Sequence, residues 1–473
     1  MSKPATKDGV GQLRLTFGFP DPKDATQQTQ DNGSQASPTA APSTDKPERK
    51  RKWHSLFDKV FALSNLQRAW QQVADNRGAA GVDGITIVIF ARNASERLAH
   101  LSQDLRNKTY RPQPVRRVEI QKSGGGQRPL GIPTVRDRIV QQALRQVLEP
   151  IFEATFSSRS HGFGPQRGCK TALAVVDQAL RYGYTFVVDA DIACFFDTVD
   201  HEKLLSALNE EIADGSVLRL IRYVLEAGVV LPWASESEPT EEGTPQGGPL
   251  SPLLANVYLH AFDEAVTQAG YGLVRYADDF VIFTKSESEA VAALELCRHW
   301  LQDRLGLRLH PEKTRVVSVT EGFEFLGFHY FRDPKTGDLC KEVRRKSVQR
   351  FRDAIRERTP RLRTQRWVKP PHVTYSRLVR NQRVTEMIRQ VNGYLRGWHW
   401  YFKSARSRFT PPFNSFDGFL RRRIRLAITG RVGNGWWNQL LPNTLLRQLG
   451  LRDLETLDKQ YRAGQLTTPA RQG

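Results

Sequence analysis

The chain has 473 residues, and its 70 lysines and arginines against 50 aspartates and glutamates give a formal net charge of +20. A charge of this size favours a polyanionic partner such as nucleic acid, and the length predicts more than one hydrophobic core. The sequence has no secretory h-region and no apolar stretch long enough to span a membrane. We therefore expect a cytoplasmic protein with no membrane partner.

The N-terminal part differs in composition from the rest. Residues 27–47 are rich in Gln, Ser, Thr, Ala and Pro and carry few side chains to bury. We expect residues 1–50 to form a disordered N-terminal extension, with the apolar island Leu13–Pro20 as a candidate docking segment. Four cysteines follow far apart, without a Cys-x-x-Cys pair, so neither a zinc site nor a disulfide framework is indicated.

The most informative segment is Val274–Phe283, in which Asp278 and Asp279 stand between two short apolar runs. Runs rich in Val, Ile and Phe are typical of strands, which puts the aspartates at or near the tip of a β-hairpin. Adjacent carboxylates repel each other unless a positive group lies against them, and divalent cations prefer carboxylate oxygens. The alternative is an Asp-Asp turn between ordinary strands.

A second acidic strand lies upstream, at Thr185–Asp191, and a helical pattern begins at about Asp200. Two strands that each deliver an aspartate to one point can hold two magnesium ions. That arrangement suits in-line phosphoryl transfer, in which one metal activates the attacking oxygen and the other stabilises the leaving oxygen.

Seven blocks now indicate a family, because they resemble those of bacterial group II intron-encoded reverse transcriptases/maturases, in the same order. The resemblance runs from about Trp53 to Leu457. The blocks are Gly78–Gly84, Gln127–Pro133, Asp191 with Phe195–Asp197, Gly243–Pro252, Tyr276–Asp279, Pro311–Thr314 and Phe325–Phe328.

This resemblance implies an α+β right-hand polymerase. We expect fingers at 51–168, a palm with an antiparallel sheet at 169–330, a basic helical thumb/maturase-like domain at 331–435 and a C-terminal segment at 436–473. Val391–Trp398 resembles a segment that follows the polymerase core in group II maturases and that viral reverse transcriptases lack. No cysteine follows Cys340, so we expect no zinc endonuclease domain.

By resemblance, Asp191, Asp278 and Asp279 are the catalytic residues. They would bind two Mg²⁺ ions, for which Mn²⁺ can substitute, and the backbone carbonyl of Ile192 would also lie near the metals. Asp191 is preferred over Asp189, which shares its strand face, because the family motif aligns Asp-Ile with Phe-Phe-Asp.

Nucleotide-binding residues are expected in several blocks. Lys122 and Arg128 flank the glycine run 123–126, and a loop with two cations can fold over a triphosphate; the alternative is an ordinary glycine hairpin. By resemblance, Phe196 excludes a 2′-hydroxyl, whereas Phe195 is expected in the core. Gln246 would bind the nucleotide or template.

The later blocks predict contacts to the leaving group and the primer. Lys313 would lie near the leaving pyrophosphate, unless it is an exposed strand-end lysine. Phe325, Leu326 and Gly327 would position the primer end. One block departs from the family pattern: Gly164 stands where Gly-Phe-Arg-Pro has its arginine, and Arg167 is a candidate replacement.

Charge is unevenly distributed along the chain. Residues 171–340 carry 13 Lys+Arg against 27 Asp+Glu, and residues 341–430 carry 24 against 5, so an acidic region precedes a basic one. We expect the arginines there to contact phosphates and the aromatic residues among them to form helix core. The predicted nucleic-acid contacts are Arg366, Arg396, Lys403, Arg421, Arg422 and Arg423.

The sequence thus predicts an RNA-directed DNA polymerase that uses an RNA template, a DNA primer and deoxynucleotides. It also predicts a second role in binding group II intron RNA to assist splicing. One alternative is an intron-independent reverse transcriptase in defence or DNA repair. Another is an RNA-binding splicing factor without polymerase activity, against which the intact aspartates argue.

Overall fold

The computed structural model describes residues 52–121, 127–231, 237–238, 240–362, 378–405, 413–430 and 441–464. The predictions on residues 1–51, Lys122 and Arg366 lie outside these residues, and so does the side chain of Arg128. No helix in the described ranges is long and apolar enough to cross a membrane. The four cysteines are all described, and all are free, as the sequence predicts.

Five helices at the N-terminal end pack around one core. They are α1 (Phe57–Phe61), α2 (Leu63–Asp75), α3 (Ile87–Arg92), α4 (Ala94–Arg106) and α5 (Val135–Glu153). Apolar residues recur at helical spacing on α2 and α5, and Leu66, Val140 and Leu144 are fully buried where the two helices meet. Thr134 caps α5, because its side chain accepts a hydrogen bond from the Asp137 amide.

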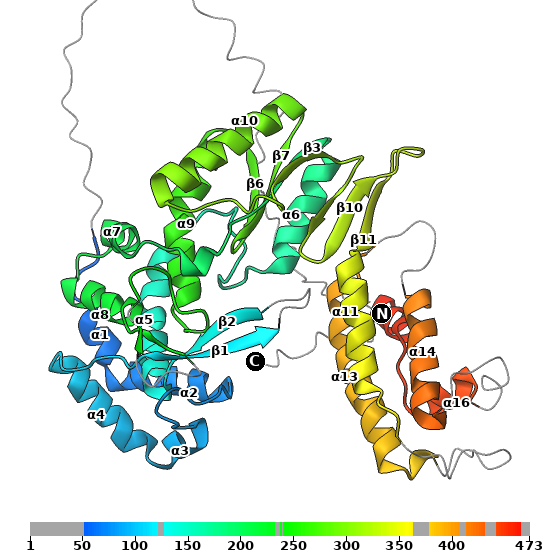
Figure 1. Ribbon diagram of the computed structural model, residues 1–473, viewed down its shortest axis with the longest axis horizontal. Helices are drawn as coiled ribbons and strands as arrows, with labels where there is room; N and C mark the ends of the chain where they lie inside the picture. The colour runs from blue at the N-terminus through cyan, green and yellow to red at the C-terminus, as the bar shows by residue number, and fades with distance from the viewer. Residues whose placement is uncertain are drawn as a thin grey trace, which may run out of the picture.

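A small sheet extends from these helices toward the middle of the molecule (Figure 1). Its antiparallel hairpin is β1 (Val115–Gln121) with β2 (Gln127–Ile132). Two short strands, β4 (Val229–Val230) and β5 (Ser237–Glu238), complete the order β2-β1-β4-β5. The hairpin therefore carries the two ends of the glycine run that the sequence associates with a nucleotide.

The central sheet is antiparallel and has the order β6-β7-β3-β8. Its strands are β3 (Phe186–Asp191), β6 (Gly272–Tyr276), β7 (Asp279–Thr284) and β8 (Arg315–Ser318). Alternate residues of each strand enter different cores: Val188 and Ile282 pack with helices α9 (Ser251–Gln268) and α10 (Glu287–Arg298), whereas Val187 and Val281 pack with α6 (Cys169–Arg181). Both faces of the sheet are thus covered. The helices α7 (His201–Glu211) and α8 (Gly215–Leu225) complete this part of the chain.

A third sheet, of order β11-β10-β9, follows in the chain. Its strands are β9 (Phe323–Phe325), β10 (Phe328–Arg332) and β11 (Leu339–Val343). The segment expected to be helical from residue 331 therefore begins with strands, and its first helix starts only at Arg345. Residues 333–337 lie in the turn between β10 and β11, and a short turn between two apolar runs is a local hairpin signal.

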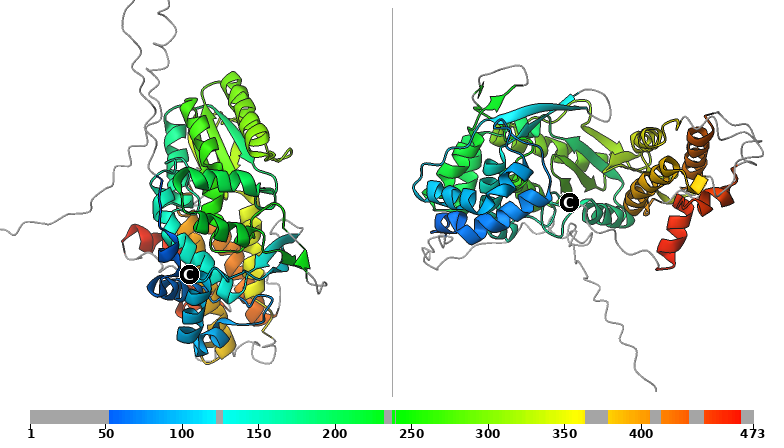
Figure 2. Two further views of the ribbon diagram at one scale, coloured as in Figure 1. Left: turned by 90° about the vertical axis from the view of Figure 1, so that its left-hand side faces the viewer. Right: turned by 90° about the horizontal axis from the view of Figure 1, so that it is seen from below.

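Five helices close the described chain: α11 (Arg345–Arg358), α13 (Gln382–Phe402), α14 (Asn414–Thr429), α16 (Asn443–Gln448) and α17 (Leu454–Arg462). Trp398 packs against Phe351, Phe402 and Phe416 at ring-centroid distances below 5 Å, which confirms that these aromatic residues form helix core. Figure 2 shows these helices and the N-terminal helices at opposite ends of the molecule, with the central sheet between them. The predicted α+β class with an antiparallel palm sheet is confirmed.

Candidate active site

The strand register brings the predicted catalytic aspartates together. Tyr276 pairs with Asp279, which leaves Ala277 and Asp278 as a two-residue turn between β6 and β7. Ala277 has φ +59°, the left-handed conformation that such a tight turn requires. Asp191 pairs with Asp279 across β3 and β7. Directly opposed residues share a sheet face, so these two carboxylates are neighbours and Asp278 stands beside them in the turn.

This cluster of carboxylates creates an electrostatic demand for a cation. Burial raises the pKa of Asp279 well above its ordinary value, and the negative charges of Asp189, Asp191 and Asp278 raise it further. A divalent ion between these oxygens would reverse that effect, so the donor set fits a hard metal ion. Among the described residues, no three His, Cys, Asp or Glu side chains are arranged closely enough to count as a metal-binding group. The metal assignment therefore rests on register and charge.

Asp189 lies on the same face but has a different environment. Arg315 Nη2 lies 3.2 Å from Asp189 Oδ2 and forms an ion pair with it. Burial raises the pKa of Asp189 to about 6, which the charge of Arg315 opposes. Arg315 of β8 thus holds the Asp189 carboxylate.

Lys313 forms an ion pair with Asp191, a predicted catalytic residue. Its ammonium lies 2.9 Å from Asp191 Oδ1, and the side chain is 55% exposed. The amide of His310 also donates to the Asp191 carbonyl, at 2.8 Å. Lys313 can therefore neutralise charge at the reacting centre, where the sequence expected a contact to pyrophosphate.

The turn Ala277–Asp278, called the catalytic turn below after its predicted role, is held by a buried arginine for which the sequence predicts no role. Arg275 is fully buried and its Nε donates to Asp263 Oδ1 of α9 at 2.6 Å. Its Nη1 donates to the Ala277 carbonyl at 3.0 Å, and its Nη2 donates to Ser160 Oγ at 2.9 Å. The guanidinium thus links α9, the loop before α6 and the turn that carries Asp278. Arg275 and Asp263 are thus two buried, oppositely charged side chains that pair with each other. The sequence around Arg275 gives no sign of this partner.

The same loop fits closely against the turn. A Cβ on Gly162 would lie 2.6 Å from the Ala277 nitrogen, so only glycine is accommodated there. The Gly162 carbonyl accepts a hydrogen bond from Asn256 Nδ2 at 2.9 Å, which ties it to α9. The predicted family block Gly162–Pro165 therefore supports the catalytic turn directly.

At Gly164, where the family pattern has an arginine, there is little room for a side chain. A Cβ on Gly164 would lie 2.8 Å from Glu153 Oε1. Arg167 pairs with that glutamate at 3.6 Å and donates to the carbonyls of Ser157 and Ser160. Arg167 thus holds the loop from inside, and its guanidinium is already engaged by protein partners.

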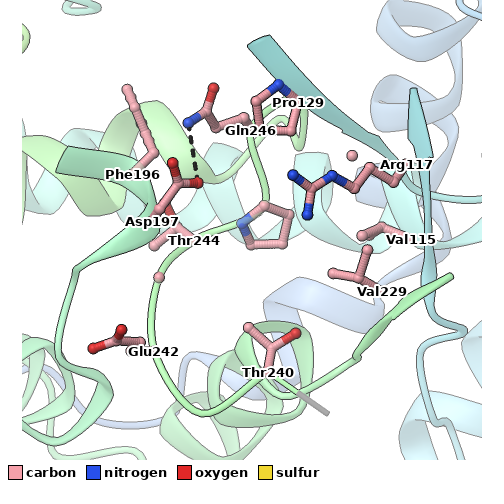
Figure 3. A pocket seen from close by; sticks show the side chains of 13 residues that line it. Val115, Arg117, Pro129, Phe196, Asp197, Val229, Thr240, Glu242, Thr244 and Gln246 are labelled. Carbon is pink, nitrogen blue, oxygen red and sulfur yellow. Dashed lines mark hydrogen bonds between the residues drawn. The ribbon is translucent and has the colours of Figure 1, made fainter. Parts of the chain in front are cut away.

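A pocket of about 380 Å³ lies between the β1–β2 hairpin, the Phe196–Asp197 turn and the segment 240–246 (Figure 3). Phe196 and Asp197 form one wall and Arg117 faces them from the other, with Gln246 at the rim. Gln246 Nε2 donates to Asp197 Oδ1 at 3.2 Å. The pocket therefore brings together two of the predicted nucleotide-binding residues. Asp191, Asp278 and Asp279 are not among the residues that line it.

The glycine block around Gln246 is fitted to the hairpin. The Gly131 amide donates to the Gln246 carbonyl at 2.8 Å. Gly247 has φ +125°, and a Cβ there would lie 2.6 Å from the Gly131 carbonyl. Glycine is therefore required at 247 for both conformation and space. Asp197 and Thr244, from two of the family blocks, also line the pocket. Arg117 lines it as well, but no sequence block singled it out.

The two adjacent phenylalanines differ as predicted. Phe195 is 2% exposed and packs in the core against Tyr258. Phe196 is half-buried and lines the pocket. Their ring centroids lie 5.2 Å apart in an edge-to-face arrangement, so one ring supports the other.

The primer-positioning block forms a tight turn against α13. Leu326 and Gly327 both have positive φ, at +44° and +85°. The Tyr401 hydroxyl donates to the Leu326 carbonyl at 2.8 Å, and the Arg344 amide donates to Gly327. Phe325 is fully buried. Its side chain can support the turn but cannot touch a primer, which corrects that part of the expectation.

The basic helices use part of their charge internally. Arg421 pairs with Asp453 at 3.1 Å, and Arg423 donates to the Thr359 carbonyl at 3.1 Å. Arg396 and Arg422 are exposed and have no ion pair with a described residue. Lys403 stacks on two aromatic rings. Of the predicted phosphate contacts that the structure describes, Arg421 and Arg423 thus have protein partners for their guanidinium groups, whereas Arg396 and Arg422 are exposed.

Comparison with known proteins agrees with this geometry. The family profile described as "Reverse transcriptase (RNA-dependent DNA polymerase)" matches residues 120–330, which contain every catalytic candidate. The protein YkfC of Escherichia coli is 34% identical, over 56% of this chain and 80% of YkfC. The group II intron-encoded protein LtrA of Lactococcus lactis is 42% identical, over 55% of this chain and 54% of LtrA. A nuclear intron maturase of Arabidopsis thaliana is 36% identical over a shorter stretch, 28% of this chain and 16% of that protein.

Proposed function

Because this chain belongs to the reverse transcriptase family, with group II intron-encoded relatives, we propose that it copies RNA into DNA with two Mg²⁺ ions and also binds group II intron RNA. Reverse transcriptases use divalent metal ions, an RNA template and a primer. The choice of Mg²⁺, the second role and the individual residue roles belong to the proposal.

The observation that carries the catalytic part is the pairing of Asp191 with Asp279 across two central strands, next to Asp278 in the turn. Bound between these carboxylates, the metal ions would activate the primer hydroxyl and stabilise the leaving oxygen. The backbone carbonyl of Ile192 follows Asp191 directly and would lie within the same group.

The protein's own side chains would hold the other reactants. Phe196 and Gln246 would place the sugar and base of the incoming nucleotide in the pocket under the β1–β2 hairpin. Lys122 and Arg128, which flank the glycine run in the sequence, would bind the phosphates of the nucleotide. Lys313 would move from Asp191 toward the phosphates, because both are anionic and lie at the same centre. Leu326 and Gly327 would position the primer end.

The intron role rests on two features. The relative LtrA is described as intron-encoded, and the segment 341–430 carries 24 Lys+Arg against 5 Asp+Glu. A basic helical surface after the polymerase core offers phosphate contacts to a structured RNA. LtrA is matched over 54% of its length, so its full activity is not transferred.

The catalytic test is primer extension on an RNA template. Asp191→Asn and Asp278→Asn should lower the rate by about 10³-fold or more, the scale of charge stabilisation in phosphoryl transfer, while RNA affinity stays near that of the unmodified protein. Asp189→Asn is the matched control, because Asp189 shares the strand face but pairs with Arg315. Equal losses in all three variants would contradict the metal assignment.

The intron role has a separate test. The Asp278→Asn protein should bind a folded group II intron RNA more tightly than an unrelated RNA of equal length. Equal affinity for the two RNAs would leave the polymerase assignment intact and remove the maturase role.

A further inference from the structure

Two lysines from distant parts of the chain meet at one indole ring. Lys170 Nζ of α6 lies 3.7 Å from a ring centroid of Trp400 on α13, and Lys403 Nζ lies 3.5 Å from it. Lys403 also lies 3.6 Å from the ring of Tyr461 on α17. The sequence positions 170 and 400 gave no reason to expect this contact.

These two ammonium groups lack a negative counterpart within the described ranges. Neither lysine forms an ion pair with a described carboxylate, and the pKa of Lys170 is lowered by burial and by the positive charge of Lys403. The face of an aromatic ring attracts a cation and offsets part of this cost. A phosphate beside these lysines would offset the remaining repulsion.

The lysine pair also lies next to the reacting centre. Lys170 lies in the first turn of α6 beside Thr171, whose Oγ1 lies 3.0 Å from His161 Nδ1. The His161 amide in turn donates to the carbonyl of Arg275, the residue before Tyr276, at 2.8 Å. Tyr276 begins the catalytic turn, and Tyr401 donates to the Leu326 carbonyl of the primer-positioning block. Trp400 precedes Tyr401 on α13. The first turn of α6 and the end of α13, which carry the two lysines, therefore lie beside the catalytic turn and the primer block.

We propose that Lys170 and Lys403, arranged around the Trp400 ring, form a site for a backbone phosphate of the primer–template duplex beside the catalytic turn. This site rests on the proposed polymerase function and adds Lys170, Trp400 and Tyr461 to it. The ligand is a phosphodiester, and the duplex is its source because the site adjoins the primer block. The ring holds the lysines in place, so less side-chain entropy is lost when the phosphate binds.

The test measures binding apart from chemistry. A labelled RNA-template/DNA-primer duplex is titrated with Asp278→Asn protein at several salt concentrations, with and without Lys170→Gln, Lys403→Gln or both. Each substitution should weaken duplex binding several-fold, and the double substitution should lower the slope of log K against log salt by about 0.7–0.9, the contribution of one phosphate contact. Lys170→Arg should retain most of the affinity and slope.

Two controls separate this role from a structural one. Lys59→Gln removes an equally exposed lysine on α1, at the other end of the molecule, and should leave both readouts unchanged. Thermal unfolding of each variant reports the contribution of the cation–ring contacts to the fold. Lys170→Gln is the cleaner variant, because Lys403 also contacts Tyr461.

Two results would overturn the proposal. An unchanged duplex affinity and salt slope in the folded double variant would make the lysine pair only a packing contact between α6 and α13. A loss confined to a structured RNA without primer would assign the phosphate to that RNA. Failure of the polymerase function itself would appear elsewhere, as absent extension by the unmodified protein despite normal duplex binding.

Discussion

The catalytic turn and the basic helices use charge in opposite ways. At the turn, Arg275 is fully buried and each of its nitrogens donates to a fixed acceptor, so the guanidinium holds a backbone conformation. On α14, Arg421 and Arg423 are engaged by protein partners while Arg422 between them is exposed. A charge total alone therefore locates neither function. The partner of each charged group decides whether it builds the fold or meets a ligand.

The largest effect should come from breaking the buried pair at the turn. Arg275→Met leaves Asp263 as an uncompensated buried charge, and we expect a loss of about 3–5 kcal/mol in the free energy of unfolding. Chemical denaturation measures it. Arg275→Lys should also lower the free energy of unfolding, because one ammonium cannot reach Asp263, Ser160 and the Ala277 carbonyl together.

A double variant shows whether Arg275 only stabilises the fold or also positions the turn. Arg275→Met with Asp263→Leu removes both charges, so most of the stability should return. The extension rate should stay low at saturating nucleotide, because the Ala277 carbonyl has lost its donor and the turn that carries Asp278 is no longer held. Full recovery of stability and rate together would show that Arg275 has no positioning role.

This contrast explains what the sequence could predict about the site. The hairpin with its two aspartates was readable because strand periodicity and turn chemistry are local signals. The block order then matched a family, and the register placed Asp191 opposite Asp279 as expected. Arg275 stands in the same decapeptide, but its partner Asp263 lies on a different helix. A buried ion pair depends on tertiary contacts, which no local pattern encodes.

The second comparison separates two neighbours in the palm, Phe195 and Phe196. Phe195→Ala should cost about 3–5 kcal/mol of unfolding free energy, because the ring is almost fully buried and leaves a cavity. Phe196→Ala should instead relax discrimination against ribonucleotides by roughly 10- to 200-fold, the range that pocket shape can supply. Ribonucleotide incorporation and thermal unfolding are measured for both variants. Unchanged sugar selection in Phe196→Ala would leave Phe196 as a packing residue.

The basic region was harder to interpret from sequence. The run Arg421–Arg423 looks like one cluster, yet a helix turns by about 100° per residue, so consecutive side chains point in different directions. Asp453 and Thr359, which engage the outer two arginines, come from other elements. The sequence did not predict the hairpin of β10 and β11 for another reason. Most of this hairpin lies in the segment from residue 331 that was expected to be basic and helical.

The smallest effect should come from the exposed arginine of that run, and it sharpens the comparison most. Arg422→Gln should leave the unfolding temperature unchanged but lower the salt slope of RNA binding by about 0.7–0.9, because one phosphate contact is lost. Arg421→Gln should do the reverse. It removes an ion pair to Asp453, which is almost fully buried, and that carboxylate still accepts from the Thr456 amide. We therefore expect lower stability with an unchanged slope.

Filter binding at several salt concentrations and thermal unfolding give both quantities for each variant. If Arg421→Gln changed the slope as much as Arg422→Gln, the ion pair would open on RNA binding, and internal partners would not exclude an arginine from a phosphate-binding surface.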